Sequence, residues 1–345
     1  MMKQMLAAVL TEPGAPLDLR EVPVPVPGPG ELLIKLEACG VCHTDLHVRD
    51  GSASAAGHPH PLILGHEGIG RVVAQGPGAK RYELGERLAL PWLHDTCGSC
   101  PECLGGSESF CADQRAHGFS VHGGFAEYAI VRESFTTRIP DGLDPVTAAP
   151  LLCAGVTAYG AIRKAELAPG KTCMVVGCGG LGLYAVQLAK QSGAQVVAVD
   201  TSQRKLDIAR EAGADHTFLA GEDPGGRTRD LGGADACINF APSAAPWKAM
   251  VDGIRPRGWI IGVAMVPDPV PLSMEWLTYT GARITGTSVG TRQELNELLQ
   301  IGARTNLKIP TERVDLRNVN DALDRLAQST VDGRMVIEFD SFAGR

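Results

Sequence analysis

The stretch TCMVVGCGGLG, residues 172–182, joins a short apolar run to a glycine-rich segment. Its last six residues fit the pattern G-x-G-x-x-G, and residues 180–192 have the apolar periodicity of a helix. A second apolar run, residues 195–200, follows that helix. Strand, glycine-rich turn, helix and strand together make a βαβ unit, so this stretch predicts a parallel sheet with helices packed on it.

The glycine pattern in this setting predicts a dinucleotide site. Gly177 permits the tight turn, Gly179 lets a pyrophosphate approach the backbone, and Gly182 allows the helix to pack on the strand. The helix that begins at Gly180 offers N–H donors and a partial positive charge to the phosphates. The alternative interpretation is a glycine-rich turn with a structural role only.

Asp200 ends the second strand and predicts the choice of cofactor. Its carboxylate would accept hydrogen bonds from both hydroxyls of an adenosine ribose. It would also repel a 2′-phosphate, which favours NAD over NADP, although the nearby cations Arg204 and Lys205 weaken that exclusion. Without a nucleotide, Asp200 would be an ordinary capping residue at the strand end.

The rest of the chain extends the same α/β fold. The sequence predicts a β-rich first part, followed by alternating strands and helices after Pro140. Val and Pro alternate over 22–27, which suits an extended lead-in rather than a central strand. Strands are expected at 31–37, 62–73, 125–131, 236–240, 259–263, 283–287 and 334–339, and helices at 148–165, 203–212, 291–303 and 319–327.

Composition narrows the class of protein. The chain has 345 residues, 44% hydrophobic and 21% charged, which suffices for two domains that fold without disulfides. Its formal charge of -7 argues against a nucleic-acid partner. No apolar run reaches the roughly 18 residues of a membrane span, and residues 1–10 lack the features of a secretory signal. We therefore expect a cytoplasmic protein with no membrane partner.

The cysteines divide into a cluster of four and six others. The cluster has the spacing C-x2-C-x2-C-x7-C, which lets one loop surround a single ion with four thiolates. Four protein ligands leave no position for a substrate, so we expect a structural zinc held by Cys97, Cys100, Cys103 and Cys111. The alternative is a group of clustered free thiols.

A second set of chemically active residues is scattered along the chain. The segment CGVCHTDLH, residues 39–47, contains thiol, imidazole, hydroxyl and carboxylate groups. His66 and Glu67 follow in a glycine-rich segment, expected to be a strand, and Cys153 stands at the start of a predicted helix. Each of these residues alone has an ordinary structural role. Spacing alone does not connect Cys42 with the others.

The strings GVCHTDLH, LGHEGIG, LLCAGVTAYGA and VVGCGGLG, together with the four-cysteine loop, cover nearly the whole chain. In that order they resemble the zinc-dependent alcohol dehydrogenases of the medium-chain dehydrogenase/reductase superfamily, above all the tetrameric yeast and bacterial members. The resemblance implies that Cys42, His66 and Cys153 hold a catalytic zinc and leave its fourth position to water or alcohol. Asp45 would orient His66, and Glu67 would lie behind the metal.

The resemblance also implies residues around the substrate and the cofactor. Thr44 and His47 would relay the alcohol proton to solvent, where the alternative is a helix cap and a surface imidazole. Trp92 would narrow the alcohol pocket, where the alternative is ordinary packing. The expected cofactor contacts beyond the glycine turn are His43, Thr157, Leu181, Asp200, Lys205, Val263 and Arg334.

The implied fold has two domains. A GroES-like β-rich catalytic domain would span 1–150 and be completed by 288–345, and a Rossmann domain would span 151–287, with the active site in the cleft between them. The reaction would be the reversible oxidation of primary or secondary alcohols to aldehydes or ketones, with NAD as hydride acceptor and zinc as Lewis acid. Two zinc ions per chain and a homotetramer are also implied, with a dimer left open.

Three other functions fit parts of the same pattern. A zinc-free quinone or enoyl reductase shares the fold but would lack Cys42, His66 and Cys153. A dehydrogenase acting on thiol adducts, of the formaldehyde type, shares the zinc site and is harder to separate. A non-catalytic protein that binds NAD and zinc would need neither Thr44 nor His47.

Overall fold

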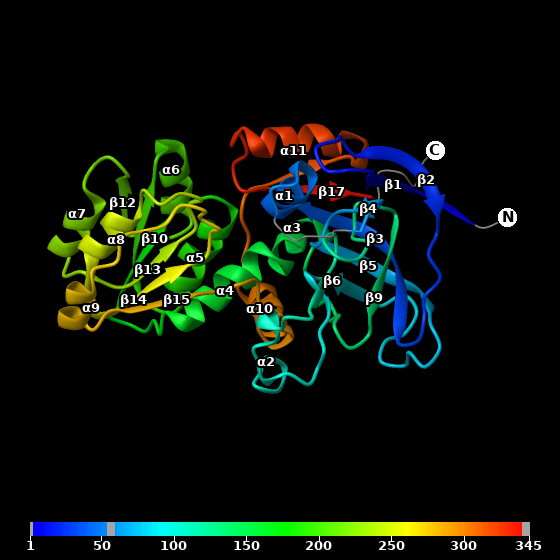
Figure 1. The fold of residues 1–345 in the computed structure, drawn as a ribbon, viewed down its shortest axis with the longest axis horizontal. Helices are drawn as coiled ribbons and strands as arrows, with labels where there is room; N and C mark the ends of the chain where they lie inside the picture. Colours follow the sequence, from blue (N-terminus) through cyan, green and yellow to red (C-terminus); the bar gives the residue numbers. More distant parts are fainter. Residues whose placement is uncertain (1–2, 54–58, 340–345) are drawn as a thin grey trace. The chain divides into compact units, whose positions relative to one another are not determined.

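A six-stranded parallel sheet forms the centre of residues 154–290 (Figure 1). Its strands have the order β12-β11-β10-β13-β14-β15, so the chain winds outward in both directions from β10. Every residue of β10 is buried, as expected for an apolar strand covered on both faces. The bounds are β10 (Thr172–Val176), β11 (Gln195–Asp200), β12 (His216–Leu219), β13 (Ala234–Asn239), β14 (Ile254–Gly262) and β15 (Arg283–Gly286).

Helices connect these strands and pack on the sheet. The first of them to follow β10 begins at Gly180, directly after the glycine-rich turn, and ends at Gln191. The next begins after Ser202, whose hydroxyl accepts a hydrogen bond from the backbone N–H of Lys205 at 3.5 Å. The helices are α4 (Ala154–Lys164), α5 (Gly180–Gln191), α6 (Gln203–Glu211), α7 (Pro224–Asp230), α8 (Trp247–Gly253) and α9 (Met274–Thr280).

The computed structural model describes residues 3–53 and 59–339, and Met1–Cys153 with Thr291–Arg345 make a second, β-rich unit. Its largest sheet has the order β16-β17-β3-β5-β6, and β9 also pairs with β3. Strand β17 (Arg334–Glu338) runs antiparallel to β3 (Glu31–Val41), so the C-terminal segment completes a sheet that the N-terminal segment begins. Figure 1 shows the red β17 among the blue strands.

Two smaller sheets, β2-β1-β4 and β7-β8, complete the β-rich unit. Strand β2 is an edge strand that ends at Pro23, which agrees with the extended lead-in expected there. The other strands are β1 (Gln4–Leu10), β2 (Asp18–Pro23), β4 (Leu62–Ile63), β5 (Gly68–Gln75), β6 (Arg87–Leu90), β7 (Leu93–Asp95), β8 (Arg115–Ala116), β9 (Tyr128–Arg132) and β16 (Thr311–Val314). The helices are α1 (His43–Asp50), α2 (Pro101–Leu104), η1 (Glu108–Phe110), α3 (Pro145–Ala148), η2 (Ala149–Leu152), α10 (Arg292–Thr305), η3 (Leu316–Asn318) and α11 (Val319–Ala327).

The structure corrects the strand predicted over 62–73, because the chain changes sheets within it. Strand β4 pairs with β1, whereas β5 pairs with β3. His66 and Glu67 lie in the turn between the two strands and not in a strand. Gly65 has φ +93°, a conformation that favours glycine and ends the extended run just before His66.

The helix predicted over 148–165 is also wrong as a single element. The 3₁₀ helix η2 ends at Leu152, and α4 begins at Ala154. Cys153 between them has φ −131° and ψ −68°, outside the helical region. Cys153 therefore precedes a helix and is not part of one.

Candidate active site and metal centres

Four buried side chains converge in the β-rich unit. One possible ligand atom from each of them lies within 4.8 Å of all the others. The first residue caps the N-terminus of α1, the next two lie in the turn between β4 and β5, and the last separates η2 from α4. The four are Cys42, His66, Glu67 and Cys153. The structure thus brings together residues that their spacing in the sequence does not connect.

Asp45 ties two of these segments together. Its carboxylate accepts hydrogen bonds from the backbone N–H of Cys42 at 2.9 Å and of Gly65 at 3.0 Å. The same carboxylate lies 3.3 Å from Nδ1 of His66, and Asp45 is fully buried. Because Nδ1 is engaged by Asp45, Nε2 is the imidazole nitrogen available to a metal.

The donor set fits a zinc ion. Both ring nitrogens of His66 are buried without a hydrogen bond among the described residues, and Nε2, the one that does not face Asp45, is the nitrogen that a bound metal would satisfy. The Cys153 thiol beside Cys42 holds the pKa of Cys42 well below its usual range, and His66 and Arg334 act in the same direction against burial. Thiolate and neutral imidazole are the ligands that zinc prefers, and three of them leave one position open.

Glu67 forms a buried ion pair with Arg334, which is 3% exposed. Burial raises the pKa of the Glu67 carboxyl above its usual range, and the Arg334 guanidinium opposes that rise. A Cβ at position 40 would come within 1.9 Å of Glu67 Oε2, so Gly40 provides the room for this carboxylate. The expected contact of Arg334 with a pyrophosphate stays a prediction, because its guanidinium faces Glu67 here.

Thr44 and His47 both lie in α1, which begins at His43. The Oγ1 atom of Thr44 is 3.8 Å from Sγ of Cys42, and Nδ1 of His47 is 3.0 Å from Oγ of Ser52. The residue at the N-cap is Cys42, so the interpretation of Thr44 as the helix cap is wrong. The hydroxyl therefore lies beside a candidate ligand, and the half-buried imidazole lies one helical turn further on.

Trp92 lies directly against the candidate zinc ligand His66. The two rings meet edge to face with 5.1 Å between their centroids. Phe119 packs on the indole at 5.3 Å, and the indole N–H donates to Gln114 at 3.2 Å. Trp92 is therefore packed and hydrogen-bonded, and it also borders the cluster, so its role in an alcohol pocket stays a prediction.

The four-cysteine loop has the dimensions of a zinc site. The sulfur of Cys97 is 3.6 Å from that of Cys111 and 3.9 Å from that of Cys103, and the Cys100 sulfur lies within 4.8 Å of all three. A tetrahedral zinc with bonds of about 2.3 Å separates its sulfurs by about 3.8 Å. Hydrogen bonds from the backbone N–H groups of Ser99 and Cys100 lower the pKa of Cys97 to about 6, which favours the thiolate that a metal needs.

The glycine-rich turn at the end of β10 has room for a phosphate. A Cβ at Gly179 would meet no atom within 4 Å, whereas one at Gly182 would lie 1.9 Å from the carbonyl oxygen of Gly177. Asp200 accepts hydrogen bonds from the backbone N–H of Cys178 at 2.7 Å and of Ser202 at 2.9 Å. The turn, the start of α5 and the acidic residue therefore lie together, as a dinucleotide requires.

The other residues expected to contact the cofactor lie in several elements. Thr157 is buried in α4, and Leu181 is half-buried in the first turn of α5. Lys205 lies in the first turn of α6, and Val263 directly follows β14. His43 is the exposed first residue of α1 in the other unit. Their contacts with a cofactor stay predictions.

Comparisons with known proteins agree with this geometry. The family model "Alcohol dehydrogenase GroES-like domain" matches residues 28–141, and the model "Zinc-binding dehydrogenase" matches residues 180–304. An alcohol dehydrogenase of Geobacillus stearothermophilus is 39% identical over 338 residues, which are 97% of this chain and 100% of that protein. The chain belongs to the zinc-dependent alcohol dehydrogenases. It is therefore an oxidoreductase of the alcohol dehydrogenase type, and the prediction of its family is confirmed.

Solved structures support the fold of this alcohol dehydrogenase. The crystal structure of AibC covers 98% of this chain and 96% of its own, with a TM-score of 0.91 and 30% identity. The acetophenone reductase of Geotrichum candidum, in complex with NAD, covers 99% of both chains with a TM-score of 0.87 and 29% identity. The predicted fold class, a GroES-like β-rich domain with a Rossmann domain, is confirmed.

Sequence reasoning missed two buried polar pairs near these sites. Glu108, 5% exposed, accepts hydrogen bonds from the backbone N–H of Arg292 at 2.9 Å and from its guanidinium at 2.8 and 2.6 Å. This pair fastens the four-cysteine loop to the start of α10. The imidazoles of His94 and His117 meet at 3.1 Å. Neither pair has a local signal, because its members are distant in the sequence.

Proposed function

We propose that this alcohol dehydrogenase reversibly oxidises primary or secondary alcohols to aldehydes or ketones, with NAD as the hydride acceptor. The observation that carries the proposal is the buried set Cys42, His66 and Cys153, whose ligand atoms lie within 4.8 Å of one another. A zinc ion held there supplies Lewis acidity, which lowers the pKa of an alcohol. NAD supplies the hydride-accepting carbon, so the chain itself must bind, orient and move a proton.

Asp45 orients the metal ligand. Its carboxylate lies 3.3 Å from Nδ1 of His66 and would hold the proton on that nitrogen, which leaves the lone pair of Nε2 for the metal. The backbone hydrogen bonds from Cys42 and Gly65 to the same carboxylate hold these two segments next to Asp45. We propose that Glu67, held by Arg334, would be available as a further oxygen ligand to a zinc ion in this cluster.

Thr44 and His47 would carry the proton away. The Thr44 hydroxyl can accept a proton from the alcohol and donate one onward, because a hydroxyl is donor and acceptor at once. His47 lies in the same helix, and its two ring nitrogens can accept and donate a proton. The position of Thr44 at 3.8 Å from the Cys42 sulfur supports this assignment.

The Rossmann unit would bind NAD in preference to NADP. Both oxygens of Asp200 already accept a backbone hydrogen bond, and each keeps a further lone pair for a ribose hydroxyl. The open space at Gly179 and the N-terminus of α5 suit the pyrophosphate. Lys205 in the first turn of α6 would weaken the preference without reversing it.

We propose two zinc ions per chain, one in each metal cluster. The four-cysteine loop offers four sulfur ligands and therefore no position for a substrate. Its zinc would be structural. The sulfur separations of 3.6 and 3.9 Å support this count.

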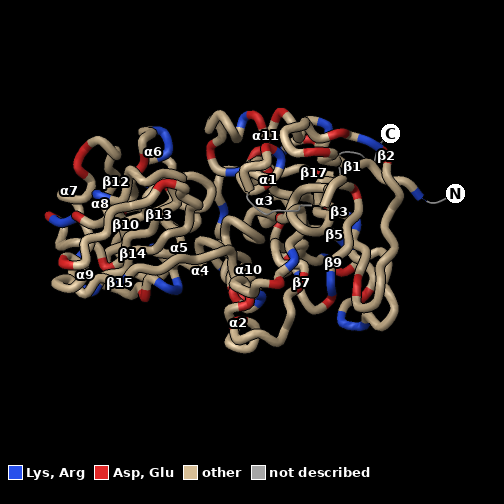
Figure 2. The backbone as a smooth tube through the Cα atoms, in the orientation of Figure 1, with Lys and Arg blue, Asp and Glu red and all other residues tan. Residues whose placement is uncertain are grey.

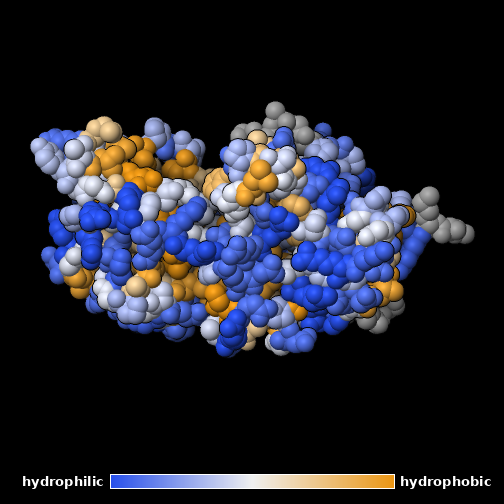
Figure 3. All heavy atoms as spheres, turned by 90° about the horizontal axis from the view of Figure 1, so that it is seen from below, coloured by the Kyte–Doolittle hydropathy of each residue, from blue (hydrophilic) through white to orange (hydrophobic). Residues whose placement is uncertain are grey.

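The native assembly would be a homotetramer, with a dimer as the smaller alternative. Strand β15 is the edge of its sheet, and its unpaired backbone groups are suited to pairing with a second copy. Helix α9 has no buried residue, and apolar atoms are visible at the surface of this unit in Figure 3. The exposed apolar residues next to β15 include Met274 and Tyr279. Light scattering at working concentration tests this, and a monomer would contradict it.

We also propose a cytoplasmic location and no nucleic-acid partner. None of the ten cysteines, all of which the structure describes, is in a disulfide, which suits a reducing compartment. Basic and acidic residues are interspersed along both units (Figure 2), and the formal charge is -7. In the described part of the chain no single helix is long and apolar enough to cross a membrane, although the bent pair Pro145–Leu152 and Ala154–Lys164 passes by length and composition.

The experiment is a substrate panel followed by NADH absorbance. Ethanol, 2-propanol, benzyl alcohol and the formaldehyde adduct of glutathione are each offered with NAD, and then with NADP. We expect NADH from at least one simple alcohol and faster turnover with NAD than with NADP. Oxidation of the thiol adduct alone would favour the thiol-adduct dehydrogenase. No turnover with any of them would favour a non-catalytic binding protein.

A further inference from the structure

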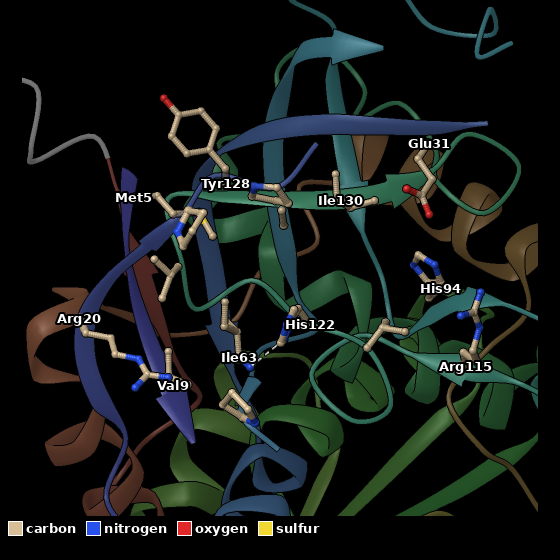
Figure 4. A pocket seen from close by; sticks show the side chains of 17 residues that line it. Met5, Val9, Arg20, Glu31, Ile63, His94, Arg115, His122, Tyr128 and Ile130 are labelled. Atoms are coloured by element: carbon tan, nitrogen blue, oxygen red, sulfur yellow. Dashed lines mark hydrogen bonds between the residues drawn. The ribbon is translucent and has the colours of Figure 1, made fainter. Parts of the chain in front are cut away.

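A cavity of about 410 Å³ lies in the β-rich unit (Figure 4). Strands β1, β2 and β9 and the turn at 121–123 supply most of its walls, which are largely apolar. Met5, Val9, Ile63 and Ile130 are among its apolar side chains. The volume falls within the roughly 300–1,000 Å³ of small-molecule sites. None of the lining residues belongs to the zinc or cofactor sets described above.

The charged side chains on the cavity wall already have partners. Because each arginine pairs with a carboxylate, the wall offers no free cation to an anionic ligand, and burying an unpaired charge is costly. The cavity therefore disfavours an anion, and its largely apolar walls favour an uncharged occupant. The pairs are Arg115 with the Asp95 carboxylate, Glu31 with the backbone N–H of Gly28 at 2.8 Å, and Arg20 with Asp18 at 3.5 Å. The dashed line in Figure 4 marks the hydrogen bond from the Ile63 N–H to Nδ1 of His122, so that nitrogen is engaged as well.

His94 differs from these residues because one of its nitrogens is unused. The side chain is 5% exposed, and Figure 4 draws it on the cavity wall between Glu31 and Arg115. Its Nδ1 lies 3.1 Å from Nε2 of His117. Within the described residues, His94 Nε2 has no hydrogen-bond partner. The cavity is thus lined by a nearly fully buried imidazole, and one of its nitrogens makes no hydrogen bond within the described part of the protein.

The neighbouring His117 decides which tautomer His94 adopts. Nδ1 of His117 is 2.7 Å from the carbonyl oxygen of Pro91, so this nitrogen carries the proton. Burial lowers the pKa of His117 to about 3, which keeps the ring neutral and leaves Nε2 as an acceptor. Nε2 then accepts the Nδ1 proton of His94. The Ile130 carbonyl oxygen lies 3.2 Å from the same nitrogen, but it has no proton to donate and makes no hydrogen bond with Nε2 in this tautomer. His94 is left with a lone pair on Nε2.

We propose that this cavity binds an uncharged small molecule with a hydrocarbon body and a hydroxyl group, of the phenol class, which donates its hydroxyl proton to Nε2 of His94. The apolar walls bind the ring by the hydrophobic effect, and the lone pair selects a donor over an acceptor. The site is independent of the proposed alcohol oxidation.

The test uses p-cresol and toluene with the zinc-loaded protein. p-Cresol has no hydrogen on its hydroxyl-bearing carbon, so it is not a substrate for hydride transfer, and toluene has the same frame without the hydroxyl. Isothermal titration calorimetry should give a Kd for p-cresol below about 1 mM, which is ordinary for a ligand of this size. Toluene should bind roughly 2- to 12-fold more weakly, the factor expected for one net hydrogen bond.

Three variants locate the binding. Val22→Trp fills the cavity from a half-buried position on β2 and should abolish binding. Val26→Trp, four residues on, is the matched control: Val26 is 87% exposed and outside the lining, so binding should persist. His94→Leu should bring p-cresol down to the affinity of toluene. Circular dichroism checks that each variant is folded.

Several results would overturn the proposal, and two of them need only the wild-type protein. Absence of p-cresol binding at 5 mM, or equal affinity for p-cresol and toluene, would do so. Full binding by Val22→Trp would assign the probe to another place, such as the zinc cluster. An unchanged preference for p-cresol in His94→Leu would remove the role of Nε2.

Discussion

Replacing His117 by glutamine should make the protein less sensitive to acid. His117 is 1% exposed, and burial lowers its pKa to about 3, against about 6.5 in an unfolded chain. A histidine with a lowered pKa is neutral in the folded state, while the unfolded state takes up a proton as the pH falls below about 6.5. The contribution of the neutral His117 to the free energy of unfolding is therefore fully present above about pH 6.5. It is lost as the pH falls from there towards 3. At about 1.36 kcal/mol per pH unit, the protonation of His117 in the unfolded state lowers the free energy of unfolding by about 2 kcal/mol between pH 7 and pH 5.

Urea unfolding of wild type and His117→Gln at pH 7 and pH 5, at constant zinc, measures this contribution. The glutamine amide can still donate to the Pro91 carbonyl and accept from His94, so the variant isolates the titration from the packing. The wild type should lose about 2 kcal/mol more than the variant on going from pH 7 to pH 5. Metal loss and other titrating groups affect both proteins and cancel in the difference. Equal losses in the two proteins would refute the reasoning.

The remaining predictions concern the cofactor, the relay and the loop. Asp200→Gly should lower the ratio of kcat/KM for NAD over NADP by roughly tenfold or more, since hydrogen bonds to a charged group contribute about 1.5–3 kcal/mol each; an unchanged ratio would contradict the role of Asp200. Thr44→Ala should reduce the rate of alcohol oxidation roughly 10²–10⁴-fold while zinc content and NAD affinity are preserved. Thr44→Ser should keep most of the wild-type rate. Turnover near wild type in the alanine variant would remove Thr44 from the relay. Glu108→Ala should speed zinc release to a colorimetric chelator several-fold and destabilise the protein by about 1–3 kcal/mol. The loss of stability is smaller than for a fully buried pair because the Arg292 side chain is 42% exposed. An unchanged release rate would show that the pair does not hold the loop.

The parts of the site that are local in the sequence could be predicted from it. The βαβ unit around Gly177 and the four-cysteine loop each fit within about 30 residues, so their spacing reports their geometry directly. Cys42, His66 and Cys153 meet through the pairing of distant strands, and only the resemblance to a family connected them beforehand. The breaks at Gly65 and Cys153 have no clear signal in the sequence, because apolar residues stand on both sides of each, and only the structure shows the backbone turning there.

Other features depend wholly on tertiary contacts. Glu108 and Arg292 are 184 residues apart, and no residue pattern around either of them predicts the pair. The Pro91 carbonyl oxygen sets the tautomer of His117, and His117 in turn sets the tautomer of His94. The lone pair on Nε2 of His94 therefore depends on three residues that meet only in the folded structure. Such chains of hydrogen bonds have no periodicity for a sequence pattern to report.

The central claim is that the cluster of Cys42, His66 and Cys153 holds the zinc on which alcohol oxidation depends. The direct measurement is zinc per chain and ethanol-dependent NADH formation on the same preparations of wild type and Cys153→Ala, with NAD binding as the control for folding. The account predicts two zinc ions and turnover in the wild type, and one zinc ion, intact NAD binding and background turnover in the variant. A variant that keeps wild-type turnover with only one zinc ion bound would contradict it.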